Sequence, residues 1–368
     1  MYIHQRENWS EFTWDREKLS NLLAEARYLQ GRLLGRMGVL GFHMKNEASL
    51  QTLTQDVIKS SEIEGERLNI DQVHSSIARR LGIDTGGMKP TDRNVEGIVE
   101  IMLDATSNYN QPLTKTRLCN WQAALFPTGR SGMHKITIGK WRGESSGPMQ
   151  VISGPFGREK IHYEALDYNI LDQEMQKFIK WVETKSPLDL VIKAAIAHFW
   201  FVTIHPFDDG NGRIARVIAD MILARSENSP HRFYSMSSEI QLTRSSYYNV
   251  LEKCQKGTSD ITIWIELFLN CLKHAINDSE KILEKVLKKA KFWEIHGKEQ
   301  FNERQHKMIN LLLDSFDGKL TSSKWAILTK CSQDTALRDI TELLTRQILA
   351  KECAGGRSTS YIITNERE

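Results

Sequence analysis

The segment IHPFDDGNGRIAR, residues 204–216, joins two stretches with the apolar periodicity of helices. The first stretch, SPLDLVIKAAIAHFWFVTI, is predicted to begin with Ser186 as its N-cap and Pro187 in its first turn. The second, RIARVIADMILAR, repeats its apolar residues at helical spacing. The turn between them gathers histidine, aspartate, asparagine, glycine and arginine, and so many polar and permissive residues in so short a segment indicate a bound ligand.

The turn contains the elements of an anion site. Gly210 and Gly212 flank Asn211 just before the second helix, so free backbone N–H groups gather at a helix N-terminus. Arg213 and Arg216 are three residues apart and therefore lie on one face of that helix. Two arginines and a helix end suit more than one negative charge, as in a di- or triphosphate.

The remaining polar residues indicate a metal ion and a base. Asp208 or Asp209 would be repelled by the anion unless a cation bridged them, and Mg²⁺ accepts one or two carboxylates together with phosphate oxygens. His205, at the end of the first helix, is suited to act as general base for a hydroxyl that attacks the phosphate. The alternatives are a structural histidine and an ordinary Asp-Gly-Asn-Gly turn. An EF-hand is excluded because its closing glutamate and other ligands are missing.

The segment resembles the Fic family signature, H-P-F-x-[D/E]-G-N-G-R-x-x-R, at every fixed position, and the order of segments is similar over roughly residues 50–275. The matching residues are His205, Pro206, Phe207, Asp209, Gly210, Asn211, Gly212, Arg213 and Arg216. The resemblance implies a mostly helical fold that transfers AMP from Mg-ATP to a Ser, Thr or Tyr hydroxyl of a target protein.

The resemblance also implies roles for single residues. His205 would deprotonate the target hydroxyl, Phe207 would anchor the loop in the core, and Asp209 would hold the magnesium ion. Asp208 falls at the variable position of the signature and receives no role.

The resemblance assigns the other matching residues to the nucleotide phosphates. Gly210, Asn211 and Gly212 would form the anion hole. Arg213 and Arg216 would bind the β- and γ-phosphates.

Residues 147–155, GPMQVISGP, are predicted to form a hairpin because Gly and Pro bound them on both sides. They follow GKWRG and fall where the family has a flap that aligns the target segment by strand addition. Ser153 and Gly154 of this segment are assigned to the cofactor-binding residues, the alternative being an ordinary edge hairpin.

Residues 244–257, RSSYYNVLEKCQKG, are similar to the family's helix that closes over the adenine. Tyr247 or Tyr248, with Gln255, would contact the base or ribose. A pair of core tyrosines is the alternative.

Residues 60–68, SSEIEGERL, are similar to the family's inhibitory motif, [S/T]-x-x-x-E-[G/N], through Ser60, Glu64 and Gly65. A carboxylate that reached Arg216 would form a bidentate pair and occupy the arginine meant for the γ-phosphate. The alternative is a solvated helix end. In some relatives this glutamate also supports removal of AMP, so that activity stays open.

The whole chain is expected to be mostly α-helical, with four parts: an N-terminal helical domain (1–82), a Fic-type core with the hairpin flap (83–276), a charged connecting helix (277–300) and a winged helix-turn-helix domain (301–368). In the last part three helices precede a hairpin with AGGRS at its tip. Its candidate recognition helix, SQDTALRDITELLTRQ, has no excess of basic residues, so DNA, protein contacts and a homodimer all stay open as its partners.

Composition limits the class of protein. The net charge of +3 is too small to argue for nucleic acid or membrane binding, and no spanning segment or signal peptide is predicted. The cysteines are dispersed and odd in number, which suits reduced thiols and a cytoplasmic protein: Cys119, Cys254, Cys271, Cys331 and Cys353.

The favoured function is an autoinhibited protein adenylyltransferase that uses ATP and Mg²⁺, acts on a target protein and is open to self-modification. The alternatives are an enzyme that removes AMP or transfers another phosphate-containing group, and a nucleotide-sensing DNA-binding regulator.

Overall fold

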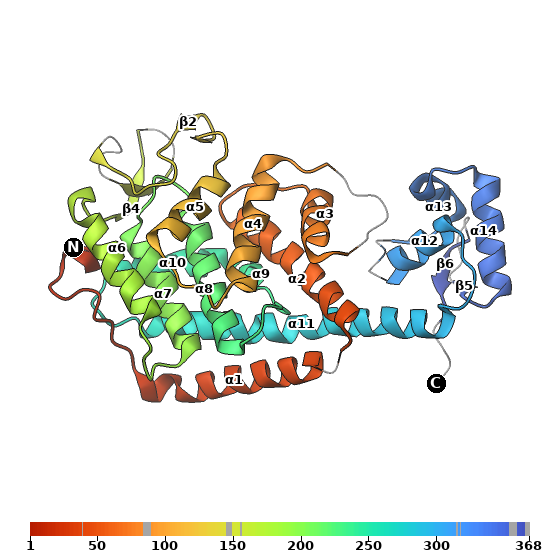
Figure 1. The fold of residues 1–368 in the computed structure, drawn as a ribbon, viewed down its shortest axis with the longest axis horizontal. Coiled ribbons are helices and arrows are strands. Elements are labelled where there is room, and N and C mark those ends of the chain that lie inside the picture. The colour runs from red at the N-terminus through yellow and green to blue at the C-terminus, as the bar shows by residue number, and fades with distance from the viewer. Residues whose placement is uncertain are drawn as a thin grey trace. The chain divides into compact units, whose positions relative to one another are not determined.

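The computed structural model describes residues 1–38, 40–83, 90–144, 149–154, 157–313, 316, 318–352 and 359–364. Most of these residues are helical, as the sequence predicts, and the strands form small antiparallel hairpins (Figure 1). The chain divides into two compact units, residues 1–280 and 281–368.

The elements of the first unit run, in chain order: η1 (Ile3–Gln5), α1 (Arg16–Gly38), α2 (Phe42–Ile63), α3 (Ile70–Leu81), α4 (Arg93–Ser107), α5 (Lys115–Leu125), β1 (Arg130–Ser131), β2 (His134–Lys135), β3 (Gln150–Ser153), β4 (Lys160–Glu164), α6 (Tyr168–Glu183), α7 (Leu190–Ile204), α8 (Asn211–Glu227), α9 (Met236–Leu242) and α10 (Arg244–Gln255). Helix α11 (Thr262–His296) has residues in both units, so the connecting helix expected at 277–300 is the second half of a longer helix.

Helix α7 is the centre of the first unit. Every residue from Val191 to Ile204 is buried, and α7 packs along α8 more extensively than any other two elements pack together. The helix begins at Leu190 and not at the predicted Ser186, because the Asp189 side chain accepts the Val191 N–H as N-cap. The buried α7 therefore fixes the start of the turn that follows it, and its packing along α8 fixes the end of that turn.

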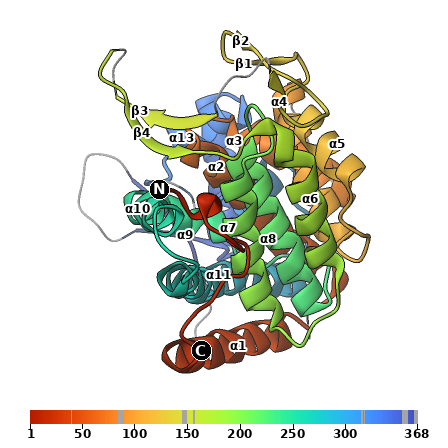
Figure 2. The same cartoon turned by 90° about the vertical axis from the view of Figure 1, so that its left-hand side faces the viewer.

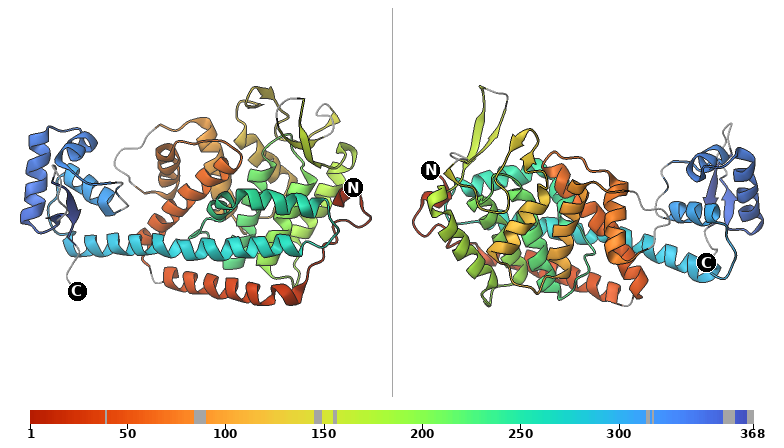
Figure 3. Two further views of the ribbon diagram at one scale, coloured as in Figure 1. Left: turned by 180° about the vertical axis from the view of Figure 1, so that it is seen from behind. Right: turned by 45° about the horizontal axis from the view of Figure 1, so that its top comes forward.

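Helix α1 lies alongside α11 in Figure 1 and in the left view of Figure 3. Its exposed charges pair with those of α11, as in Lys18 with Glu266 at 2.7 Å. Exposed pairs of this kind add little stability, so the contact depends on the buried apolar side of α1, with Leu19, Ala26 and Leu33.

Helix α2 places the predicted inhibitory segment beside α8. Along its length it packs against α3 and α9. The Asp56 carboxylate accepts hydrogen bonds from the Ser235 hydroxyl and the Ser237 N–H at the start of α9. The C-terminal end of α2, with Ser60 in its last turn, therefore has a fixed position.

The hairpin predicted within residues 147–155 is larger in the structure. Residues 150–153 form β3 alone, and β3 pairs with β4 at 160–164, with Ser153 opposite Lys160 (Figure 2). The prediction placed both strands in a segment that has room for only one. Residues 147, 148 and 155 lie outside the described residues.

The second unit has its own core. It contains α12 (Glu303–Leu313), α13 (Ser322–Thr329), α14 (Gln333–Thr345), β5 (Leu349–Lys351) and β6 (Tyr361–Ile363), and Leu320 forms a bridge with Tyr361. Three helices followed by a hairpin is the order that the sequence predicts, although membership of the winged-helix class stays a prediction. The core residues include Met308, Trp325, Ile340 and Leu343, and the predicted AGGRS tip lies outside the described residues.

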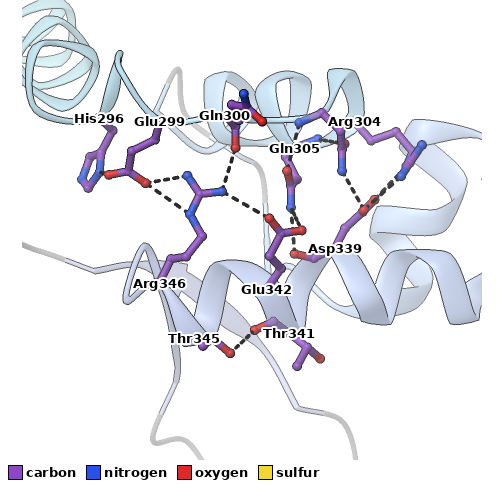
Figure 4. A network of polar contacts seen from close by, with 11 residues as sticks. His296, Glu299, Gln300, Arg304, Gln305, Asp339, Thr341, Glu342, Thr345 and Arg346 are labelled. Carbon is purple, nitrogen blue, oxygen red and sulfur yellow. Dashed lines mark hydrogen bonds and ion pairs between the residues drawn. The ribbon is translucent and has the colours of Figure 1, made fainter.

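Polar contacts hold α14 to the chain that precedes it (Figure 4). Arg304 forms two hydrogen bonds with Asp339, Gln305 donates to Glu342, and Arg346 donates to Glu299. The other charged residues of α14, Asp334 and Arg338, are exposed and of opposite sign. A helix that reads DNA needs a positive face, so this face of α14 gives no support to a DNA-binding function.

The four cysteines in the described ranges, Cys119, Cys254, Cys271 and Cys331, are free thiols, and Cys353 lies outside them. None of the helices that the structure describes is both long and apolar enough to cross a lipid bilayer.

The second unit should fold without the first. We expect residues 281–368, expressed alone, to unfold in one cooperative transition in urea, because the fragment contains a complete apolar core around the fully buried Trp325. Trp325→Ala should cost about 3–5 kcal/mol, which is enough to unfold so small a domain. The exposed Ile327→Ala is the matched control and should change little. A fragment without a cooperative transition would place the domain boundary elsewhere.

Candidate active site

The turn between α7 and α8 is closed by its own asparagine. The Asn211 side chain accepts the Phe207 N–H at 2.9 Å and donates to the Phe207 carbonyl at 2.8 Å. Phe207 is fully buried, with its ring 4.9 Å from that of Trp141. Phe207 therefore anchors the loop as expected, and the Asn211 side chain holds the loop's shape while only its backbone remains for an anion.

Gly210 is required by both backbone conformation and space. Its φ of +88° is in the left-handed region, and a Cβ there would lie 3.0 Å from Phe126 and 3.1 Å from Leu125. Gly210 is the N-cap of α8, so the first free N–H groups of that helix face the site.

His205 ends α7 in a left-handed conformation, with φ +54°. Its Nδ1 lies 3.1 Å from the Val202 carbonyl, and because a carbonyl only accepts, the proton is on Nδ1 and Nε2 is the free base. Burial, followed by the charge of Arg142, lowers the pKa of His205 to about 4, against the opposing effects of the Val202 carbonyl, Asp209 and Glu64. The imidazole is therefore neutral at physiological pH, as a general base must be.

Arg142 holds the histidine in place. Its Nε donates to the His205 carbonyl at 2.8 Å, its backbone N–H donates to the Pro206 carbonyl at 2.9 Å, and its Nη2 donates to the Leu166 carbonyl. Arg142 is buried and was not singled out from the sequence, although it lies in the GKWRG stretch. Nothing in the sequence pairs it with a histidine 63 residues away.

The two aspartates of the loop have different partners. Asp208 accepts the Thr137 N–H at 2.8 Å, which ties the segment after β2 to the loop. Asp209 accepts hydrogen bonds from the Ser131 hydroxyl and from the Gly210 N–H. Ser131 is a further residue of the site that sequence reasoning missed.

Asp209 can serve as one ligand of a magnesium ion. Each of its oxygens has one protein donor and keeps a further lone pair. In the part of the chain that the structure describes, no three His, Cys, Asp or Glu side chains gather in a metal-binding group. The site therefore fits an ion that takes one carboxylate and completes its shell with phosphate oxygens and water, as Mg²⁺ does.

Arg216 is buried and joins α8 to the end of α2. Its Nε donates to the Ser60 hydroxyl at 2.9 Å, and its Nη2 donates to the Ser60 carbonyl at 2.9 Å and to Glu64 Oε1 at 2.8 Å. Burial works to lower the pKa of this guanidinium, but the charge of Glu64 and the hydroxyls of Tyr247 and Tyr248 raise it by more. The ion pair predicted between Glu64 and Arg216 is present.

The predicted bidentate geometry of that pair is wrong. Glu64 makes one hydrogen bond to Arg216, from Nη2 to Oε1, while the Ser60 hydroxyl accepts the Nε–H. Ser60 therefore shares the arginine with Glu64.

Arg213 has an acidic partner of its own, which the sequence analysis did not identify. Its Nη1 donates to Glu66 Oε2 at 2.7 Å, and its guanidinium lies 5.1 Å from the centre of the Phe126 ring. The Arg213 side chain is buried, whereas about half of the Glu66 side chain is exposed.

The Glu64 carboxylate lies against the start of α8. A Cβ on Gly212 would lie 2.3 Å from Glu64 Oε1, so only glycine allows this approach. The carboxylate therefore occupies the region in which the sequence predicts an anion, beside both the helix N-terminus and Arg216.

The residues that the sequence assigns to the adenine differ in exposure. Tyr247 and Gln255 are buried, with the Tyr247 hydroxyl 2.9 Å from His198 and the Gln255 amide 3.4 Å from the Thr203 hydroxyl. Tyr248 alone is partly exposed, and its hydroxyl lies 3.5 Å from the Ile63 carbonyl.

Helix α10 is thereby joined to the end of α2. Arg244 donates to the Ile63 carbonyl at 2.8 Å and stacks on the Tyr248 ring. The helix assigned to the adenine and the helix that presents Glu64 share this contact.

The predicted flap is also tied to α10. The Ser153 hydroxyl lies 2.6 Å from His162 Nε2 on the opposite strand, and His162 Nδ1 lies 2.6 Å from Glu252. The Glu252 carboxylate accepts hydrogen bonds from Lys256 and His162, which lower its pKa to about 2, so this carboxylate stays charged. Gly154 follows β3 at the start of the connection to β4.

Two family models match separate parts of the chain. Residues 112–223 match the Fic/DOC family, and residues 2–83 match a domain of unknown function, DUF4172. The first range includes the turn from His205 to Arg216, and the second includes Glu64 and Glu66.

Named relatives are similar over part of their length. The protein adenylyltransferase Fic of Nematostella vectensis is 34% identical over 111 residues, which are 29% of this chain and 24% of that protein. The protein adenylyltransferase Fic of Aedes aegypti is 24% identical over 239 residues, 62% of this chain and 42% of that protein. This chain therefore spans less than half of the length of either relative.

Among solved structures, a Fic family protein from Desulfovibrio desulfuricans G20 superposes with a TM-score of 0.51 at 18% identity, over 95% of this chain and 97% of that chain. This similarity shows a common fold.

We predict that His205 titrates far below an ordinary histidine. Its Cε1 resonance, assigned by its absence in His205→Asn, should keep the neutral chemical shift from pH 7 to 5 and move only near pH 4. The unfolded chain binds that proton near pH 6.5, so the histidine also makes the protein less stable as the pH falls from 6.5 towards 4. A midpoint near 6.5 would contradict the lowered pKa of His205.

Proposed function

We propose that this chain, which carries a Fic/DOC family domain at residues 112–223 behind a DUF4172 domain, is a protein adenylyltransferase. It would transfer AMP from Mg-ATP to a Ser, Thr or Tyr hydroxyl of a target protein. The observation that carries the proposal is that one turn joins His205, whose lowered pKa keeps it neutral, to the N-terminus of α8 with its two buried arginines, Arg213 and Arg216.

The base is supported by its tautomer. With the Nδ1 proton directed to Val202, Nε2 of His205 can take the proton of an incoming hydroxyl. The hydroxyl oxygen then bonds to the α-phosphorus, the bond from that phosphorus to its bridging oxygen breaks, and pyrophosphate leaves. A hydroxyl oxygen is a weak nucleophile until a base removes its proton.

The leaving phosphates would be held at the start of α8. The backbone N–H groups of Asn211 and Gly212 at the start of α8 and the guanidinium groups of Arg213 and Arg216 would supply positive charge where pyrophosphate develops negative charge. A magnesium ion on Asp209 would add charge neutralisation at the same phosphates.

The Glu64 carboxylate would act as an inhibitor within the chain. It lies against Gly212 and pairs with Arg216, so it competes with the terminal phosphate for the same donors. A nucleotide would then bind in a pose unsuited to attack at the α-phosphorus.

Removal of AMP is a second candidate function of the same site. About three-tenths of the Glu64 side chain is exposed, so water has access to a carboxylate that lies near the base. In that reaction Glu64 would orient a water for attack on the phosphodiester.

His205→Ala should abolish transfer of AMP while leaving the affinity for Mg-ATP nearly unchanged, because the ring donates to the Val202 carbonyl and not to the phosphate site. The measurement is incubation with labelled ATP and cell lysate, read by mass spectrometry, beside calorimetric titration with Mg-ATP. His198→Ala is not a suitable control, because that histidine is buried in the core. His231 is partly exposed, so His231→Ala is the suitable control and should label protein at the wild-type rate. Labelling at the wild-type rate by His205→Ala would disprove the role of the base.

Glu64→Gly should raise self-labelling with AMP about tenfold, since it frees Arg216 for the γ-phosphate without touching the turn. The pair is a single charge-assisted hydrogen bond, which is worth about 1.5 kcal/mol. Arg216→Ala should not reproduce the gain, because it removes the phosphate contact together with the competitor. Glu64→Gly combined with His205→Ala should be silent. If Glu64→Gly labels no faster than the wild type at saturating Mg-ATP, Glu64 is not inhibitory.

A further inference from the structure

Two carboxylates, two residues apart, close the site from one turn. Glu64 and Glu66 follow α2 on either side of Gly65, and this turn is held by N–H groups of all three residues that donate to the carbonyls of Ser61 and Glu62. Glu64 reaches Arg216, and Glu66 reaches Arg213.

We propose that Glu66 is a second inhibitory carboxylate, which occupies the arginine of the β-phosphate as Glu64 occupies that of the γ-phosphate. The inference rests on the proposed function, because it concerns nucleotide binding at the same arginines. It makes the segment 64–66 an internal substitute for the last two phosphates of a nucleoside triphosphate.

The charges in the site support this assignment. Arg213 and Arg216 are almost fully buried, at 5% and 2% exposure of their side chains, and each has one carboxylate partner. An incoming polyphosphate therefore meets two cations already neutralised by two acids. Each buried guanidinium has an anionic partner both when the carboxylate is bound and when a phosphate has replaced it. The exchange therefore leaves no buried charge unpaired.

Arg213 also has capacity for a phosphate. Its Nε is buried and makes no hydrogen bond within the described residues, while Nη1 is used by Glu66. A phosphate oxygen could accept the Nε–H, which Glu66, bound at Nη1, leaves without an acceptor.

The two inhibitors should differ in strength and in the nucleotide that they exclude. About half of the Glu66 side chain is exposed against three-tenths for Glu64, so solvent screens the Glu66 pair more. Glu66 should weaken the binding of every nucleotide with a β-phosphate, diphosphates included. Glu64 should oppose triphosphates alone.

The test is calorimetric titration of the full chain with Mg-ADP and Mg-ATP. Glu66→Gln and Glu66→Ala should bind both nucleotides about three- to tenfold more tightly than the wild type, as expected for the loss of a partly exposed competitor. Glu64→Gly should tighten Mg-ATP and leave Mg-ADP nearly unchanged. Melting temperatures close to that of the wild type would show that the variants are folded.

Glu62→Gln is the matched control. It removes the same charge from the last turn of α2, directly before that segment, but Glu62 pairs with Lys59 at 2.7 Å and not with an arginine of α8. It should bind both nucleotides as the wild type does. If it tightens binding as much as Glu66→Gln, the effect is one of net charge and the inference is overturned.

The outcomes separate this inference from the proposed function. Wild-type affinity of both Glu66 variants for Mg-ADP would overturn the role of Glu66, even where Glu64→Gly transfers AMP. Tighter Mg-ADP binding by the Glu66 variants, with no transfer of AMP by any variant, would support Glu66 and overturn the adenylyltransferase. Absence of nucleotide binding by every variant would overturn both.

Discussion

The carbonyl end of α2 meets the amide end of α8, and the rest of the site depends on this contact. The last carbonyls of a helix have no partner within it, and a buried arginine needs acceptors. Arg216 meets both needs at once, since it donates to the Ser60 carbonyl and to Glu64 from inside the protein. The same helix end holds Arg244 through the Ile63 carbonyl, so α2, α8 and α10 meet at one point.

The turn between α7 and α8 is also held by buried polar contacts. Its backbone groups are bound by side chains that take no part in chemistry: Asn211 bridges Phe207, and Arg142 holds the carbonyl of His205. These contacts do not involve the imidazole Nε2 or the first N–H groups of α8. The groups that remain free are the ones a phosphate and an attacking hydroxyl require.

The inhibitory contact, if it works as proposed, is a competition between anions for a fixed set of donors. No large rearrangement is needed, because a carboxylate and a phosphate both suit a guanidinium and a helix N-terminus. Arg244 and Tyr248 of α10 both contact the Ile63 carbonyl of α2, so a movement of the end of α2 would change the contacts of α10 as well.

The sequence by itself determined the mostly helical fold and the place of residues 205–216 in a polar turn between two helices, because helical periodicity and a turn of glycines, asparagine and arginines are local patterns. It also identified the pairing of Glu64 with Arg216, through resemblance to a family. Only the tertiary structure decided the rest. Helix α7 starts where Asp189 caps it. The hairpin of β3 is completed by β4, a strand beyond the Gly-Pro boundary, and the single bond between Arg216 and Glu64 reflects the share of Arg216 that Ser60 takes. Arg142, Ser131 and Glu66 reach the site from 63, 78 and 147 residues away, and contacts across such separations leave no pattern in a single sequence.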